Sequence, residues 1–223
     1  MQYNPKFSAL VTGALLASAG MPQLANAALE ARIGGAYDTV LDLSWLGDAN
    51  ANGIMTWGDA TAWAAGLSVP GAPATNPAND WRLPTVDATC NGFGGGYNCT
   101  GGELGYMFYT NLGGGVLSPI SVTHNADYSL FSNVQDSGYW SSVTLVADPD
   151  DSDLDQVGVL LYEEGFQDQH FKLPTTTNAA WAVHDGDVLA AIPEPGAWAL
   201  TLAGLAALYG WRASRRHVPR KAA

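Results

Sequence analysis

The pattern of apolar and polar residues predicts a few short elements separated by long loops. Residues 34–46 alternate loosely between apolar and polar side chains, which predicts one or two short strands. Residues 56–67 place apolar side chains three and four positions apart, with Thr56 as the cap and Asp59 in the first turn, which predicts an amphipathic helix. A second helix is predicted over residues 102–112, where a run of glycines ends it.

The second half of the chain is typical of strands. Runs rich in β-branched and aromatic side chains predict strands at residues 138–146, 156–162, 166–173 and 179–184. Helices early, strands late and glycine-rich loops between them predict an α+β fold with a small antiparallel sheet. The tryptophans between the two terminal segments are expected in its core.

The N-terminal residues 1–27 have the pattern of a secretory signal peptide. Lys6 precedes an apolar run over residues 7–20, and Ala25 and Ala27 supply the small side chains that signal peptidase requires. We therefore expect export and cleavage after Ala27, which leaves residues 28–190 as one domain.

The C-terminal segment, residues 191–223, holds a second apolar run. Residues 196–211 carry no charge and are followed by a basic cluster that includes Arg212, Arg215 and Arg216. At about 1.5 Å per residue the run is about 24 Å long, slightly short of a hydrocarbon layer of about 30 Å. It predicts a single membrane helix with the arginines on the cytoplasmic side. A C-terminal core helix is the alternative, but it would not be apolar all round and then abruptly basic.

Charge is distributed unevenly along the chain. The net charge is −12, yet residues 28–190 contain 20 acidic side chains and three basic ones, Arg32, Arg82 and Lys172. So acidic a domain repels phosphate backbones, which argues against nucleic-acid binding. The acidity favours either solubility alone or a surface that attracts cations.

Arg82 is isolated among acidic residues. We expect it to pair internally with a carboxylate such as Asp80 or Glu103, because a guanidinium forms bidentate ion pairs with carboxylates. Display of Arg82 for an anionic sugar is the alternative.

Cys90 and Cys99 are the two cysteines of the chain. An even pair at this spacing in an exported protein predicts a disulfide. A catalytic thiolate or a zinc site would need histidines that the neighbouring sequence lacks.

One loop has metal-ligand spacing. Asp48, Asn50 and Asn52 alternate, Gly53 follows, and Asp59 stands eleven residues after Asp48, which is the spacing of an EF-hand-type calcium loop. Against this, Asp59 is shorter than the usual glutamate and no helix clearly enters the loop. The alternative is a polar turn before a capped helix. Residues 148–155, with five aspartates, leave the same two choices, calcium or a solvated loop. No other cofactor is indicated.

The C-terminal segment resembles a known sorting signal. The Pro193-Glu194-Pro195 triplet, the short apolar run and the arginine cluster are similar to the PEP-CTERM signal of Gram-negative bacteria. The resemblance implies recognition by an exosortase, cleavage near the triplet and association with exopolysaccharide or biofilm matrix.

The domain itself resembles the Lcl C-terminal domain, which is also found at the end of collagen-like bacterial adhesins. The resemblance lies in residues 37–45 followed by Asp48-Ala49-Asn50, in Met55-Thr56-Trp57, in the run DWRLPT at residues 80–85 and in YWSS at residues 139–142. Glu103-Leu104 and the run AWAV at residues 180–183 fit the same order. It implies a C-type-lectin-like fold with two helices, a small sheet and long loops. His184 departs from the family, whose members often have arginine there.

No catalytic constellation is evident, because the histidines are scattered and no nucleophile motif accompanies them. We therefore expect a non-enzymatic domain with polysaccharide as the candidate ligand. The alternatives are a matrix component without a specific ligand and an enzyme on a lectin-like scaffold. The expected path is a precursor anchored in the inner membrane, processed by signal peptidase and exosortase, and then a protein of the cell surface or extracellular matrix.

Overall fold

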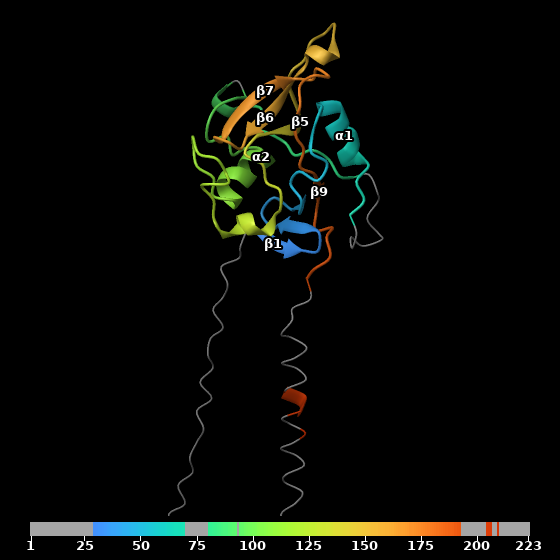
Figure 1. Ribbon diagram of the computed structural model, residues 1–223, viewed down its shortest axis with the longest axis vertical. Helices are drawn as coiled ribbons and strands as arrows, with labels where there is room; N and C mark the ends of the chain where they lie inside the picture. The colour runs from blue at the N-terminus through green and yellow to red at the C-terminus, as the bar shows by residue number, and fades with distance from the viewer. Residues whose placement is uncertain (1–28, 70–79, 93, 193–203, 207–208, 210–223) are drawn as a thin grey trace, which may run out of the picture.

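The computed structural model describes residues 29–69, 80–92, 94–192, 204–206 and 209. The predicted signal peptide, the Pro193-Glu194-Pro195 triplet and the arginines Arg212, Arg215 and Arg216 lie outside the described residues. The described residues between 29 and 192 share one hydrophobic core, and their first and last strands lie near each other at one pole (Figure 1).

The domain is mostly β, so the predicted α+β, C-type-lectin-like fold of two helices and one small sheet is wrong. A four-stranded sheet has the order β1-β2-β3-β9. Its strands are β1 (Leu29–Arg32), β2 (Gly35–Asp38), β3 (Leu43–Leu46) and β9 (Val183–Asp185). The predicted strands over residues 34–46 correspond to β2 and β3, and residues 179–184 overlap β8 and β9.

A second, five-stranded sheet has the order β4-β8-β5-β6-β7. Its strands are β4 (Ile54–Met55), β5 (Gly138–Val146), β6 (Gln156–Leu161), β7 (Phe166–Phe171) and β8 (Asn178–Ala179). β5, β6 and β7 form an antiparallel meander at the predicted positions, with register irregularities in β5 between Trp140 and Val146. The sequence missed the two-sheet plan because β4 and β8 are two residues long, too short to show alternation.

One of the two predicted helices is confirmed over most of its length. α1 (Trp57–Ala65) begins after Thr56, whose hydroxyl accepts a hydrogen bond from the backbone N–H of Asp59, and it ends at Gly66. It packs beside β5, where the Trp57 indole donates to the carbonyl of Ser141 over 2.9 Å.

The second predicted helix is only one α-helical turn, α2 (Glu103–Tyr106), continued by a π-helical turn, η2 (Met107–Asn111). Leu104, Met107 and Phe108 are buried as expected. Short 3₁₀ turns form at η1 (Cys90–Gly92), η3 (Ala126–Leu130) and η4 (Ser152–Leu154).

The predicted C-terminal membrane helix is not found among the described residues. Within the described part of the chain, no helix is long and apolar enough to cross a bilayer. Of residues 196–211, only 204–206 and 209 are described.

Aromatic side chains fill the space between the two sheets. Trp45, Trp140 and Trp181 are fully buried, and the Trp181 ring meets the edges of Trp45 and Phe131 at centroid distances of 5.1 and 4.8 Å. The Trp181 indole donates to the carbonyl of Leu46. Because a buried indole N–H needs an acceptor, this bond ties the end of β3 to the segment before β9.

Candidate functional site

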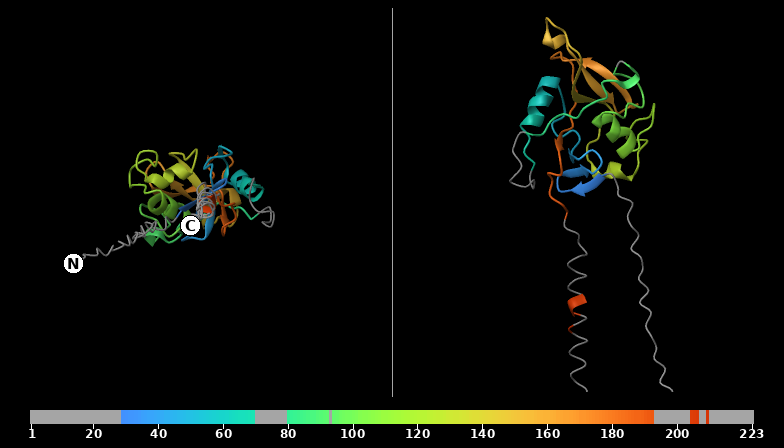
Figure 2. Two further views of the ribbon diagram at one scale, coloured as in Figure 1. Left: turned by 90° about the horizontal axis from the view of Figure 1, so that it is seen from below. Right: turned by 180° about the vertical axis from the view of Figure 1, so that it is seen from behind.

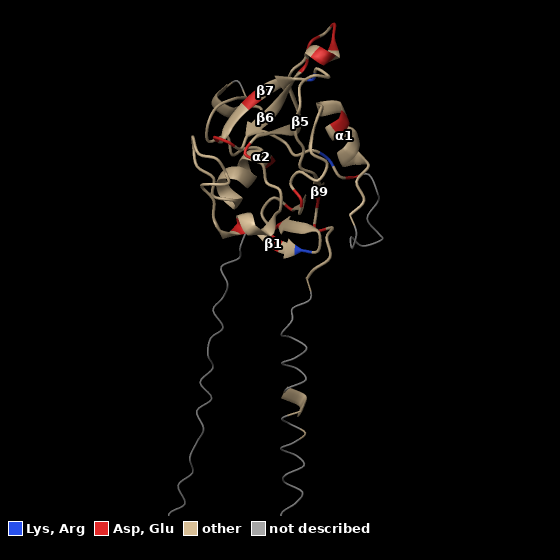
Figure 3. Ribbon diagram, in the orientation of Figure 1, with Lys and Arg blue, Asp and Glu red and all other residues tan. Residues whose placement is uncertain are grey.

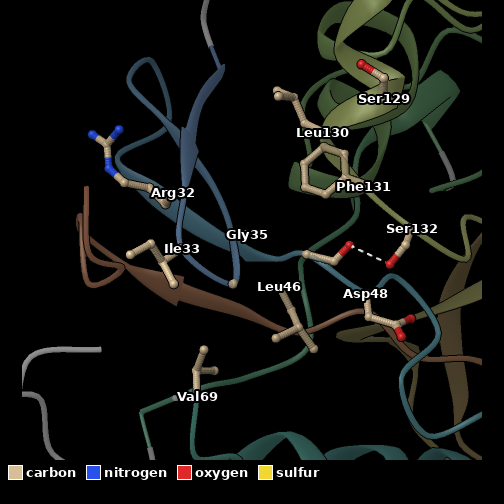
Figure 4. A pocket seen from close by; sticks show the side chains of 12 residues that line it. Arg32, Ile33, Gly35, Leu46, Asp48, Val69, Ser129, Leu130, Phe131 and Ser132 are labelled. Carbon is tan, nitrogen blue, oxygen red and sulfur yellow. Dashed lines mark hydrogen bonds between the residues drawn. The ribbon is translucent and has the colours of Figure 1, made fainter. Parts of the chain in front are cut away.

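A hollow of about 600 Å³ opens at the pole that carries β1 and β2 (Figure 4). This volume is within the range of about 300–1,000 Å³ typical of ligand pockets. Four chain segments form the wall: the β1–β2 turn, the end of β3, Val69, and residues 129–132, which span the end of η3 and the two residues that follow it. The lining residues are Arg32, Ile33, Gly34, Gly35, Leu46, Gly47, Asp48, Val69, Ser129, Leu130, Phe131 and Ser132.

Backbone hydrogen bonds hold these segments together. The Ser132 N–H donates to the Gly47 carbonyl over 2.8 Å, and the Ala49 N–H donates to the Ser132 carbonyl over 2.9 Å. On the other side, the Ile33 N–H donates to the Ala190 carbonyl over 2.8 Å. The wall is thus fixed by contacts between residues far apart in sequence.

The inner surface of the hollow is mainly apolar. Leu46 and Phe131 are each 8% exposed, and Ile33 at the rim is 44% exposed. Leu130 and Val69 add further apolar surface. Figure 4 shows the side chains of Ile33, Leu46, Val69 and Phe131 converging on the same space.

Polar groups lie at the rim, and they form hydrogen bonds with other groups of the chain. The Ser132 hydroxyl donates to the Gly47 carbonyl over 3.3 Å. The Asp48 carboxylate accepts from the Asn50 N–H at 3.1 Å and from the Asn133 side-chain amide at 3.0 Å. A carboxylate has about four acceptor sites, so Asp48 retains capacity for another donor.

Arg32 contributes to the rim, but its guanidinium is bound to two carboxylates. It donates from Nε to Asp187 Oδ1 over 3.0 Å, and from Nη2 to Asp187 Oδ2 over 2.8 Å and to Glu30 Oε2 over 2.7 Å. The hydrogen bonds to Asp187 are the largest cause of a raised Arg32 pKa, so the group stays charged. Its guanidinium carbon also lies 5.4 Å from the centre of the Tyr37 ring.

The residues predicted for calcium have separate roles. Asp48 accepts from Asn50 in a tight turn, which the Gly53 N–H closes on the Asn50 carbonyl. Asp59 forms the reciprocal cap of α1 with Thr56, whose hydroxyl donates to Asp59 Oδ2 over 2.8 Å. Across the described residues, no group of three or more His, Cys, Asp or Glu side chains could hold a metal ion. Calcium at Asp48, Asn50, Asn52 and Asp59 stays a prediction.

The aspartates of residues 148–155 project at the pole opposite β1, as Figure 3 shows in red and Figure 2 shows from behind. Their carboxylates cap turns of their own loop: Asp148 accepts from the N–H groups of Asp150 and Asp151. Asp155 pairs with Lys172 over 2.9 Å, and this hydrogen bond is the largest cause of a lowered Asp155 pKa. Through these bonds, the aspartates stabilise the turns of their own loop.

The predicted internal pair of Arg82 is confirmed, with Glu103 as the partner. Nη1 and Nη2 of Arg82 reach Glu103 Oε2 and Oε1 over 2.7 and 2.8 Å. Asp185 adds a third bond at 2.6 Å, which the sequence did not predict. The guanidinium is therefore shared between two carboxylates, which argues against its display for an anionic sugar.

The predicted disulfide between Cys90 and Cys99 is confirmed, with a Cα–Cα distance of 5.5 Å. Its loop continues the edge of the second sheet, because Gly96 and Gln167 exchange both backbone hydrogen bonds, at 2.9 and 2.8 Å. The disulfide thus fixes a loop that covers part of the edge strand β7.

The described histidines have structural contacts. His124 stacks on Tyr128, His170 bonds to the Asn178 side chain, and the buried His184 bonds to the Asp185 carbonyl while its ring meets the edge of Trp81. None of these contacts joins a base to a nucleophile.

Sequence reasoning found Asp48 but missed the hollow around it. Ile33, Val69 and Phe131 are ordinary apolar residues, and no motif links them. Comparisons with protein-family models, with curated proteins and with solved structures give no match to this chain. The geometry of the hollow is therefore the basis for assigning a function.

Proposed function

We propose that this chain is an exported, non-enzymatic protein that binds extracellular polysaccharide in the hollow beside β1 and β2. The observation that carries the proposal is the composition of the hollow, an apolar floor with hydroxyl, carboxylate and backbone groups at its rim. The C–H faces of sugar rings pack on apolar side chains, while sugar hydroxyls need a few placed polar partners.

The floor and the rim would make different contacts with a bound sugar. Leu46 and Phe131 line the floor with apolar atoms, and the more exposed Ile33 extends this apolar lining toward solvent. Asp48 and Ser132 lie where sugar hydroxyls would meet acceptors and donors.

The proposed location is the cell surface or extracellular matrix. It rests on the signal-peptide pattern of residues 1–27 and the PEP-CTERM-like segment 191–223. The Cys90–Cys99 disulfide supports an oxidising compartment, since such bonds are rare in the cytosol. Mass spectrometry of the intact protein from its native envelope tests processing by signal peptidase and exosortase, because an uncleaved chain would contradict it.

Binding can be tested with neutral oligosaccharides by isothermal titration calorimetry. Ile33→Ser removes exposed apolar surface from the rim and should weaken binding roughly five- to tenfold. Ile54→Ser is the matched control, because Ile54 is 66% exposed and does not line the hollow. If no glycan binds, or both variants weaken binding equally, the proposal fails. The chain would then be better explained as a matrix component without a specific ligand.

A further inference from the structure

The charge of the hollow depends on how Arg32 is paired. Among the described residues that line the hollow, Arg32 is the only Lys or Arg and Asp48 the only acid. The Arg32 side chain is only 11% exposed, and Asp187 and Glu30 bind it from outside the lining. One guanidinium and two carboxylates leave this group with a net charge of about −1 at neutral pH.

The geometry keeps the guanidinium away from a bound ligand. Asp187 accepts hydrogen bonds from both Nε and Nη2 of Arg32, and Glu30 also accepts from Nη2. Nη1 of Arg32 donates to the Ala31 carbonyl over 3.1 Å. Figure 4 shows the guanidinium of Arg32 on the side of the hollow away from Asp48. In contrast, the side chains of Asp187 and Glu30 are 38% and 45% exposed, so their charge faces solvent.

The other cations of the described domain do not offset this charge. Arg82 is bound to Glu103 and Asp185, and Lys172 is bound to Asp155 with its ammonium 4.1 Å from the centre of the Trp57 ring. Each of the three basic side chains between residues 28 and 190 is thus paired with at least one carboxylate. The field at the hollow is therefore negative, from the nearby carboxylates and from the whole domain.

We infer that the hollow selects a polysaccharide that carries ammonium groups, a polymer of 2-amino sugars with free amines, over one that carries carboxylates. This inference rests on the proposed polysaccharide binding and adds the charge of the ligand. A protonated amine gains attraction from Asp48 and from the Arg32 group, whereas a uronate is repelled by both. Asp187 is then a specificity-determining residue, because it neutralises the one cation at the rim.

Three oligosaccharides of equal length test the inference on the mature protein: one with free amines, one N-acetylated and one of uronic acids. At low salt the amine form should bind about three- to tenfold more tightly than the N-acetylated form, and the uronate most weakly. The difference should shrink toward 1 M salt, where the screening length falls to about 3 Å.

Asp187→Asn is the decisive variant, since it releases Arg32 from its strongest partner. It should lower the affinity for the amine form and raise the affinity for the uronate. Asp185→Asn is the matched control, because it removes the same charge from an arginine pair outside the hollow. Glu30→Gln should shift selectivity in the same direction as Asp187→Asn and serves if that variant does not fold.

The outcomes separate the two proposals. Equal binding of the amine and N-acetylated forms, or equal shifts in Asp187→Asn and Asp185→Asn, overturns the charge selection and leaves polysaccharide binding intact. Failure of all three oligosaccharides to bind overturns both.

Discussion

The buried side-chain amide of Gln167 donates a hydrogen bond of 2.5 Å to the carbonyl oxygen of Gly94, 73 residues away in sequence. The same amide nitrogen donates to the Asp87 carbonyl over 2.7 Å, and its oxygen accepts from the Asp87 N–H over 3.1 Å. One side chain of β7 therefore satisfies three backbone groups of the disulfide loop and the segment before it.

Replacing Gln167 by leucine should be strongly destabilising. Leu matches the size of Gln but leaves the Asp87 N–H and the Gly94 carbonyl without this partner, while the Asp87 carbonyl keeps its bond from the Cys90 N–H. Each buried unpaired group costs about 1–3 kcal/mol. We expect the free energy of unfolding to fall by roughly 3 kcal/mol, measured by urea denaturation. Gln169→Leu, at the exposed neighbouring position on the same strand, should change it by less than about 0.5 kcal/mol.

Reducing the Cys90–Cys99 disulfide should lower stability by about 2–3 kcal/mol, because the bond restricts the unfolded chain. Thermal melts with and without reductant measure the effect, and the Cys90→Ser, Cys99→Ser double variant should be insensitive to reductant. Equal melting temperatures for the reduced and oxidised wild type would contradict the prediction.

The Arg82–Glu103 pair should contribute to stability through Glu103, which is only 16% exposed and also accepts from the Thr85 N–H over 2.8 Å. Arg82→Met leaves this carboxylate without its cation. We expect a loss of about 1–2 kcal/mol in chemical denaturation, since Arg82 is partly exposed. Asp185→Asn, which removes the more exposed partner, should cost less; a larger loss there would show that the assignment is wrong.

Asp155 should make stability depend on acid pH. Its pKa is lowered in the folded state, so its pair with Lys172 stabilises fully above the unfolded value of about 3.9 and is lost as pH falls through the folded value. The difference in stability between wild type and Asp155→Asn should therefore be constant near neutrality and shrink below about pH 4. A difference that does not change with pH would exclude this origin.

Calcium can be tested directly at Asp48. If Asp48 acts only through its bonds to Asn50 and Asn133, Asp48→Ala should lower the melting temperature equally in calcium and in chelator. If calcium binds, the wild type should melt higher in calcium than in chelator, and the variant should lose that difference. Differential scanning fluorimetry distinguishes the two outcomes.

The sequence by itself determined features that depend on residues close together in sequence or on how few residues of one type the chain contains. The α1 cap needs only Thr56 and Asp59, three residues apart. The disulfide follows from one pair of cysteines. The internal pairing of Arg82 follows from the scarcity of cations, although the second partner, Asp185, did not.

Only the tertiary structure decided which strands pair in the two sheets and which residues line the hollow. β3 pairs with β9, as Ser44 with His184, and β4 with β8, as Ile54 with Ala179. These pairings join short strands from opposite ends of the chain, and no local pattern encodes such partners. The hollow has the same origin: Ile33, Val69 and Phe131 meet because backbone bonds from Ser132 and Ala190 close the wall. The charge of its rim depends on Arg32 and Asp187, two residues that become neighbours only when the chain folds.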